Sequence, residues 1–150
     1  MSSTIPCPAF TLPMTNGKTF DSAQQPGTYV LYCYPKDDTP GCTTESSDFR
    51  DYHASFMQAN CAIFGLSRDS ISSHTRFQEK LQLPFSLISD PDEIACTALG
   101  IMTLKNMYGK QVRGIERSTF IIHNTHIVKA YRGVKVPGHV QEVLAFVQTL

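Results

Sequence analysis

Cys42 is the residue of this sequence most suited to chemistry, because of what precedes it. Thr39 is a suitable helix N-cap and Pro40 a suitable first helical residue, which places Cys42 in the first helical turn. A thiol there lies over unpaired backbone N–H groups at the positive end of the helix dipole, and both favour the thiolate. Gly41 leaves room for a substrate to approach the backbone. The pattern favours a nucleophilic thiolate over the alternative, an inert core cysteine.

The residues around Cys42 form a longer pattern. Positions 34–45 read Tyr-Pro-Lys-Asp-Asp-Thr-Pro-Gly-Cys-Thr-Thr-Glu. The spacing Pro35-x-x-x-Thr39-x-x-Cys42 resembles the active-site signature of the peroxiredoxins, and the whole string is similar to their bacterioferritin comigratory protein (BCP/PrxQ) branch. Other segments resemble that branch in the same order: 6–20, 69–70, 90–92 and 117–120. The resemblance therefore spans nearly the whole chain.

The resemblance implies an enzyme, a thiol-dependent peroxidase that reduces hydrogen peroxide and organic hydroperoxides through a sulfenic acid at Cys42. A low pKa alone does not make a thiol react rapidly with peroxide. Lowering a thiol pKa from about 8.5 to about 6 raises the thiolate fraction at neutral pH roughly thirtyfold. The same change weakens each thiolate roughly tenfold as a nucleophile, so the two effects nearly cancel. We therefore expect groups that stabilise the transition state.

Four residues are candidates for that work. The Thr39 hydroxyl can reach the start of the helix, and Arg117, which matches the family's arginine before Ser-Thr-Phe, is the candidate cation for thiolate and peroxide. The resemblance implies that Pro35 shields the sulfur and that Glu45 orients the arginine or the helix entry. The local sequence leaves plainer alternatives open: Arg117 as a surface arginine, and Glu45 as an acid that stabilises a first helical turn.

The sequence departs from the family pattern at the cysteine that would resolve the sulfenic acid. Many members of the branch carry it five residues after the reactive cysteine, where this chain has Ser47, and others carry it in a helix that here, at 71–81, contains none. Of the remaining thiols, Cys96 is the best candidate on expected accessibility, and the others are Cys7, Cys33 and Cys61. A one-cysteine cycle is the preferred interpretation, with thioredoxin, or glutathione and glutaredoxin, as the external reductant.

Two other functions compete with the peroxidase. A redox sensor would pass oxidation from Cys42 to a partner protein, which fits the missing resolving cysteine. A general disulfide oxidoreductase would need a C-x-x-C pair, and the five cysteines contain none. That absence and the odd cysteine count also argue against a zinc site or a disulfide framework, so we expect no metal and no cofactor.

Composition narrows the partners and the compartment. Thirteen basic and thirteen acidic residues cancel, so no overall field attracts nucleic acid or an anionic membrane. No apolar stretch approaches the roughly 18 residues that a membrane span needs, and the first ten residues do not resemble a signal peptide. We expect a cytoplasmic protein without nucleic-acid or membrane partners. The branch that the chain resembles is often monomeric, which predicts a monomer.

Strands and helices are predicted to alternate along one domain of residues 1–150. The predicted strands are 29–34, 62–66, 85–88, 118–123 and 127–131, the last two joined by a turn at 124–125, after a short hairpin of 10–12 with 18–20. The predicted helices are 42–60, 71–81 capped by Asp69 or Ser70, one from Asp90-Pro91 to Gly100, and 140–147. Residues 102–113 lack periodicity and are predicted to be a loop.

This order favours an α/β fold with a central mixed β-sheet flanked by helices. The resemblance implies more: a thioredoxin-like fold in its peroxiredoxin variant, with an N-terminal β-hairpin.

Overall fold

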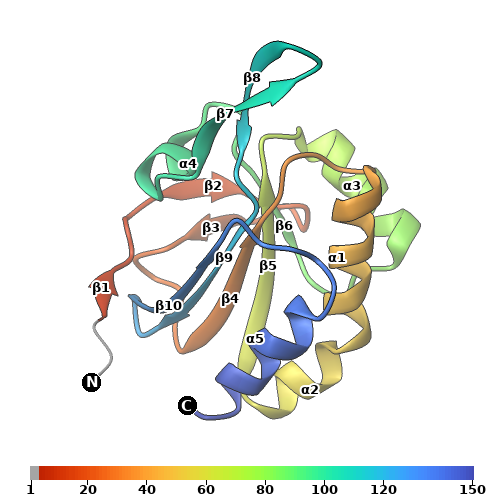
Figure 1. Cartoon of the computed structure of the whole chain (residues 1–150). Helices are drawn as coiled ribbons and strands as arrows, with labels where there is room; N and C mark the ends of the chain where they lie inside the picture. The colour runs from red at the N-terminus through yellow and green to blue at the C-terminus, as the bar shows by residue number, and fades with distance from the viewer. Residues whose placement is uncertain (1–3) are drawn as a thin grey trace.

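A six-stranded mixed sheet forms the centre of the protein. The computed structural model describes residues 4–150, and the strand order in the sheet is β1-β10-β9-β4-β5-β6. The strands β4, β5 and β6 run parallel, whereas β9 is antiparallel to β4 and β10 (Figure 1). The bounds are β1 (Ile5–Pro6), β4 (Thr28–Cys33), β5 (Cys61–Ser67), β6 (Leu87–Ser89), β9 (Ser118–His123) and β10 (His126–Arg132).

The central strand β4 separates two hydrophobic cores. Its side chains alternate in direction, as in any strand. Tyr29, Leu31 and Cys33 pack into one core, whereas Val30 and Tyr32 pack into the other. All five are completely buried, which explains why this segment is β-branched and aromatic without a polar face.

Helices cover one face of the sheet, on the right in Figure 1. This layer contains α1 (Pro40–Asp51), α2 (His53–Gln58), α3 (Ile71–Leu81) and α5 (His139–Val147). Each helix places apolar side chains in the core that contains Tyr32, among them Phe49, Phe56 and Phe77. The reactive-cysteine candidate Cys42 belongs to the same core.

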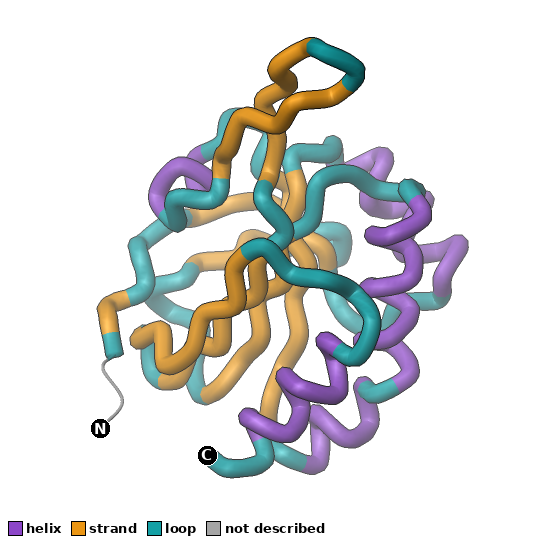
Figure 2. The backbone as a smooth tube through the Cα atoms, viewed as in Figure 1, coloured by secondary structure: helices purple, strands orange, loops and turns teal. Residues whose placement is uncertain are grey.

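The opposite face is covered by shorter elements. These are the N-terminal hairpin of β2 (Thr11–Pro13) and β3 (Thr19–Asp21), and the helix α4 (Ile94–Ala98). Phe10, Phe20 and Cys96 fill the core on this side. Figure 2 shows how strands, helices and loops are distributed over the two faces. The predicted mixed sheet with flanking helices and an N-terminal hairpin is confirmed.

The predicted helix 42–60 is wrong in one respect, because it is two helices. The helix begins at Pro40 and breaks at Tyr52, whose φ of −98° and ψ of 5° lie outside the helical region. Apolar spacing continues across the break, and Phe49 and Phe56 pack together with ring centroids 5.8 Å apart. Periodicity therefore cannot reveal a single non-helical residue.

The predicted loop 102–113 is also wrong. It contains most of a hairpin of β7 (Met102–Met107) and β8 (Lys110–Ile115), which extends from the body of the protein (Figure 1). Leu104 and Val112 are exposed, so the hairpin lacks the alternation that a half-buried strand shows. The sequence signal that could have indicated this hairpin is Gly109 in its turn. Tyr108 and Gly109 both have positive φ, as a two-residue hairpin turn requires.

The predicted helix at Asp90-Pro91 begins later than expected. The helix α4 starts at Ile94, and Glu93 with a positive φ of 59° precedes it. Asp90 still stabilises the start, because its carboxylate accepts from the backbone N–H groups of Ile94 at 2.7 Å and Cys96 at 2.9 Å. The predicted cap of α3 is confirmed, since Ser70 Oγ accepts from Ser73 N. Within residues 4–150, no helix combines the length and the apolar character that crossing a membrane requires.

Candidate active site

Cys42 lies where the sequence predicts, in the first turn of α1. Thr39 is the N-cap residue, with extended φ and ψ of −91° and 155°, and Pro40 is the first helical residue. The Thr39 hydroxyl does not cap the helix; it donates to the carbonyl oxygen of Lys36 at 2.8 Å. Its proton is therefore engaged, and its oxygen remains an acceptor at the start of the helix.

Arg117 reaches Cys42 across 75 residues of sequence. Its Nη2 donates to Cys42 Sγ at 3.4 Å, and its Nη1 donates to Glu45 Oε1 at 2.7 Å. The sheet explains this proximity: Ser118 at the start of β9 pairs with Cys33 at the end of β4, and α1 follows β4. The residue before Ser118 thus meets the helix start. The structure brings Cys42, Glu45 and Arg117 together, as the family resemblance implies.

Glu45 is completely buried beneath this arginine. Burial raises the pKa of its carboxyl from 4.5 to about 7, against the opposing effect of the charge and hydrogen bond of Arg117. Its Oε1 accepts from Arg117, whereas its Oε2 has no hydrogen-bond partner among the described residues. Glu45 is thus more than a helix-stabilising acid, because its only side-chain hydrogen bond in this part of the chain fixes the arginine.

Replacing Glu45 by glutamine is expected to change how stability depends on pH. The folded protein binds a proton at Glu45 between about pH 4.5 and pH 7, where the unfolded chain has released it. The stabilisation of the folded state by this bound proton is fully present below pH 4.5 and is lost as the pH rises through about 7. We expect the free energy of unfolding of the wild type, relative to Glu45→Gln, to fall by about 2 kcal/mol from pH 5 to pH 8. Urea unfolding at several pH values measures this difference, and parallel curves would contradict it.

Gly41 allows the close approach of Arg117. A Cβ atom built on Gly41 would lie 3.1 Å from Arg117 Nη2, closer than side chains normally pack. The glycine therefore leaves the space in which the guanidinium lies beside the sulfur.

Replacing Gly41 by alanine is expected to separate activity from stability. Alanine is favoured over glycine inside a helix by about 1 kcal/mol, so we expect no loss of thermal stability. The new methyl group displaces the guanidinium, and we expect the rate of Cys42 oxidation by peroxide to fall by about tenfold. Calorimetry and stopped-flow oxidation measure the two effects. A variant that keeps the wild-type rate would show that the guanidinium tolerates displacement.

Cys42 itself is only 1% exposed. Its neighbours in the core include Tyr32, Tyr34 and Phe49. A small peroxide needs little space, but a reductant as large as a protein cannot reach this sulfur unless the first turn of α1 loosens. Pro35 is half-buried in the segment between β4 and α1, and its shielding role stays a prediction.

The choice of Cys96 as the most accessible second thiol is wrong. Cys96 is completely buried, and burial raises the pKa of its thiol far above the usual range. It lies in the core on the opposite face of the sheet from Cys42. Cys33 shares that opposite core, whereas Cys61 lies at the start of β5, roughly 20 Å along the sheet from the active-site edge. The described structure offers no second thiol beside Cys42.

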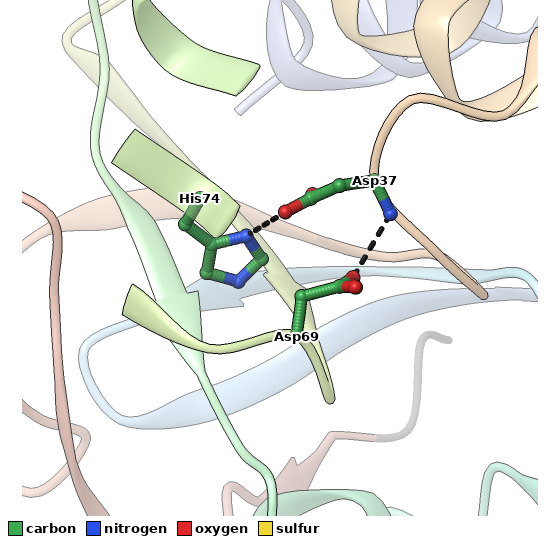
Figure 3. Close-up of side chains that lie close together, drawn as sticks. All are labelled: Asp37, Asp69 and His74. Carbon is green, nitrogen blue, oxygen red and sulfur yellow. Dashed lines mark hydrogen bonds and ion pairs between the residues drawn. The ribbon is translucent and has the colours of Figure 1, made fainter. Parts of the chain in front are cut away.

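A buried polar cluster beside this site was not predicted from the sequence. Asp37, Asp69 and His74 lie close together, and Asp37 precedes Thr39 by two residues (Figure 3). Only weak signals for this cluster are present in the sequence: Asp69 is a candidate cap, and His74 falls on the apolar face of the predicted helix 71–81. Neither signal links these residues to the segment before Cys42.

Comparison with known proteins agrees with this geometry. The family model described as the AhpC/TSA family matches residues 5–131. The chain is 46% identical over 145 residues to the peroxiredoxin Bcp of Xanthomonas campestris, and this alignment covers 94% of this chain and 91% of that protein. It is 47% identical over 131 residues to the peroxiredoxin Bcp of Bacillus subtilis, covering 86% of this chain and 83% of that protein.

A solved structure extends the similarity to three dimensions. The bacterioferritin comigratory protein of Xanthomonas campestris, described in connection with alkyl peroxide reduction activity, superposes with a TM-score of 0.88 at 44% identity. The match covers 93% of this chain and 90% of that one. The expected thioredoxin-like fold in its peroxiredoxin variant is thereby confirmed.

Proposed function

The chain belongs to the AhpC/TSA family and, within it, to the Bcp/PrxQ peroxiredoxins, which are thiol-dependent peroxide reductases. We propose that Cys42 is the thiol of this chain that reacts with peroxide. The observation that carries the proposal is the contact of 3.4 Å between Arg117 Nη2 and Cys42 Sγ in the first turn of α1. Five thiols are present, and Cys42 alone has this described contact with an arginine.

The first half of the reaction transfers one peroxide oxygen to sulfur. The Cys42 thiolate attacks the terminal oxygen of ROOH, the S–O bond forms as the O–O bond breaks, and RO⁻ leaves with the electron pair of that bond. Cys42 becomes a sulfenic acid, and RO⁻ takes up a proton to give an alcohol or water. Arg117 lies where it stabilises both the thiolate and the departing negative charge.

Four further groups assist in this proposal. Glu45 holds the guanidinium through the Arg117 Nη1 contact. The Thr39 oxygen, whose own proton is directed to Lys36, accepts a hydrogen bond from a peroxide O–H. The backbone N–H groups of the first turn have no partners within the helix and can donate to the peroxide oxygens. Pro35 limits the access of water to the sulfur.

The substrates proposed are hydrogen peroxide and small organic hydroperoxides. The alkyl peroxide reduction activity named for the Xanthomonas campestris relative supports the organic class. The burial of Cys42, which is 1% exposed, favours compact hydroperoxides over bulky ones.

We also propose that an external thiol regenerates Cys42. A thiol RSH attacks the sulfenic sulfur and releases water, and a second RSH then cleaves the mixed disulfide to give free Cys42 and RSSR. Thioredoxin, or glutathione with glutaredoxin, has the required chemistry. The burial of Cys96 and its place across the sheet support this cycle over an intramolecular one. Action as a monomer in the cytoplasm is part of the same proposal.

The test is to oxidise the protein with one equivalent of hydrogen peroxide, trap sulfenic acid with dimedone and map all five thiols by mass spectrometry. We expect the trap on Cys42 and no disulfide within the chain. A Cys42–Cys96 disulfide would refute the external cycle. Continuous peroxide loss with excess thiol supports the enzyme, whereas a single turnover that ends in a stable disulfide with a partner protein would favour the redox sensor.

A further inference from the structure

The segment that leads into α1 is held by a buried polar cluster on the α3 side of the site. This segment, residues 35–39, carries Pro35 and Thr39, the two residues proposed above to act around the Cys42 sulfur. Between them, Asp37 turns inward and is 6% exposed, whereas the next residue, Asp38, is exposed and has a positive φ of 63°. The inward carboxylate links the segment to the rest of the protein, and the exposed Asp38 adds an ion pair with Lys80 of α3 at 2.7 Å.

Asp37 is bonded in four directions. Its Oδ1 accepts from the Tyr34 hydroxyl at 2.6 Å, and its Oδ2 accepts from the Ser73 hydroxyl at 2.9 Å. Its Oδ2 also lies 2.7 Å from His74 Nδ1. Its backbone N–H donates to Asp69 Oδ2 at 2.9 Å (Figure 3). Burial raises the pKa of Tyr34 well above its usual range, so this phenol keeps its proton and remains a donor.

The surroundings of His74 engage both nitrogens of its ring. Its Nε2 lies 2.9 Å from the backbone carbonyl oxygen of Ile88, which can only accept, so Nε2 carries a proton. Its Nδ1 faces the Asp37 carboxylate, which three side-chain groups approach. His74 is completely buried. The geometry therefore fits a ring held at both nitrogens, by the Asp37 carboxylate and by the Ile88 carbonyl oxygen, in a desolvated and fully hydrogen-bonded arrangement.

Asp69 completes the cluster from the end of β5. The Oδ2 of Asp69 accepts from Asp37 N and from the Ser67 hydroxyl. Asp69 therefore holds the backbone of Asp37, whereas His74 holds the side chain of Asp37. A ring nitrogen of His74 and one carboxylate oxygen each of Asp37 and Asp69, atoms of the kind that could bind a metal ion, lie within 4.8 Å of one another. These atoms are already paired among the described residues, so the hydrogen bonds account for the arrangement without an ion.

We propose that His74 and Asp37 are positioning residues for peroxide reduction, which fix residues 35–39 so that Pro35 and Thr39 stand correctly around the Cys42 sulfur. The inference rests on the proposed peroxidase activity and extends it to α3. Neither side chain has a described contact with Cys42, so both act through the segment that they hold. Arg117 approaches the sulfur from the start of β9 and is independent of this cluster.

Two replacements of His74 test the proposal. In His74→Asn the side-chain amide takes the place of Nδ1 and can still donate to Asp37, whereas in His74→Gln the amide reaches the place of Nε2 and the contact with Asp37 is lost. We expect His74→Gln to lower the rate constant of Cys42 oxidation by hydrogen peroxide by about tenfold to a hundredfold. We expect His74→Asn to recover to within about threefold of the wild type.

Alkylation of Cys42 by iodoacetamide separates positioning from general damage. The alkylation rate depends on the thiolate, not on Thr39, so we expect it to change by less than about twofold in both variants. Gln78→Ala is the matched control, because Gln78 also lies in α3 and donates to a backbone carbonyl, that of Phe85, at 2.8 Å. We expect it to reduce stability but to keep the peroxide rate. An unchanged rate in folded His74→Gln, equal losses in both reactions, or no recovery in His74→Asn would overturn the proposal.

Nuclear magnetic resonance of the wild type keeps the proposal testable if the variants do not fold. We expect the ring N–H groups of His74 to be protected from exchange with water, because Nδ1 faces the Asp37 carboxylate and Nε2 faces the carbonyl oxygen of Ile88. Rapid exchange of these protons would overturn the proposed pairing with Asp37. This measurement does not depend on catalysis. If the wild type failed to reduce peroxide, the proposed function would fail while the His74 signals could still show the pair.

Discussion

Replacing Cys42 by serine is expected to lower the rate constant for peroxide reduction by about 10⁴-fold or more. A serine hydroxyl is almost fully protonated at neutral pH and is a much weaker nucleophile toward oxygen than a thiolate. The surrounding groups, including Arg117, cannot replace the missing nucleophile, because they act only on charge that develops when sulfur attacks. Peroxide consumption under excess dithiothreitol measures the loss.

The same variant separates Cys42 from the other four thiols. Serine is nearly isosteric with cysteine, so we expect Cys42→Ser to fold and to melt within a few degrees of the wild type. Cys7→Ser is the matched control, since Cys7 is half-buried near the N-terminal hairpin and should keep the rate within about twofold. Substantial activity in Cys42→Ser would mean that a different thiol reacts with peroxide.

Replacing Arg117 by glutamine is expected to lower the peroxide rate constant by about 10²- to 10³-fold, the usual cost of losing one group that stabilises developing negative charge. The side-chain amide of glutamine can still donate one hydrogen bond, but it carries no charge and lacks the planar fork that reaches both Cys42 and Glu45. Stopped-flow oxidation measures the effect.

Arg132→Gln is the control for the loss of a positive charge in this region. Arg132 lies in β10, donates to the carbonyl oxygens of Leu99 and Gly100, and has no described contact with Cys42. We expect its removal to change the peroxide rate constant by less than about threefold. If both arginine variants lost activity equally, the effect would belong to the overall field rather than to the contact with sulfur.

Arg117→Gln should also destabilise the fold, because it leaves Glu45 buried without its cation. Because the pKa of Glu45 is about 7, its carboxyl can take up a proton when the cation is gone, so we expect a loss of about 1 kcal/mol at pH 8 and less at lower pH. We expect the double variant Glu45→Gln with Arg117→Gln to recover part of that stability but none of the activity. Recovery of activity in the double variant would indicate that the unpaired carboxylate, and not the missing guanidinium, causes the loss.

The sequence was most informative where local chemistry and long-range pairing agree. The N-cap Thr39, the first-turn Pro40 and the buried strand before them predict the position of Cys42 at the start of α1, and the structure has it there. Arg117 was predicted to join this site only by resemblance to the peroxiredoxins. The physical reason appears in the sheet, where the antiparallel pairing of β9 with β4 brings Ser118 opposite Cys33.

The parts that were not predicted share a physical cause. The hairpin of β7 and β8 has exposed apolar side chains such as Leu104, so its sequence carries no alternation of a buried and a solvated face. The accessibility of Cys96 depended on which face of the sheet α4 covers, and a cysteine in a short helix gives no indication of that. His74 looked like a core residue, and its pairing with Asp37 depends on a tertiary contact between segments 37 residues apart.

The central claim is that Arg117 and the first turn of α1 stabilise the transition state of peroxide cleavage specifically, and do not accelerate every reaction of the thiolate alike. Stopped-flow rate constants of Cys42 with hydrogen peroxide and with iodoacetamide, in the wild type and in Arg117→Gln, test it most directly. We expect the wild-type peroxide reaction to exceed that of a free thiolate by about 10³-fold or more, with alkylation near the rate of an ordinary thiolate. We expect Arg117→Gln to lose mainly the peroxide reaction. Equal enhancement of both reactions in the wild type, and equal loss in the variant, would contradict the claim and indicate a general effect on the reactivity of the thiolate.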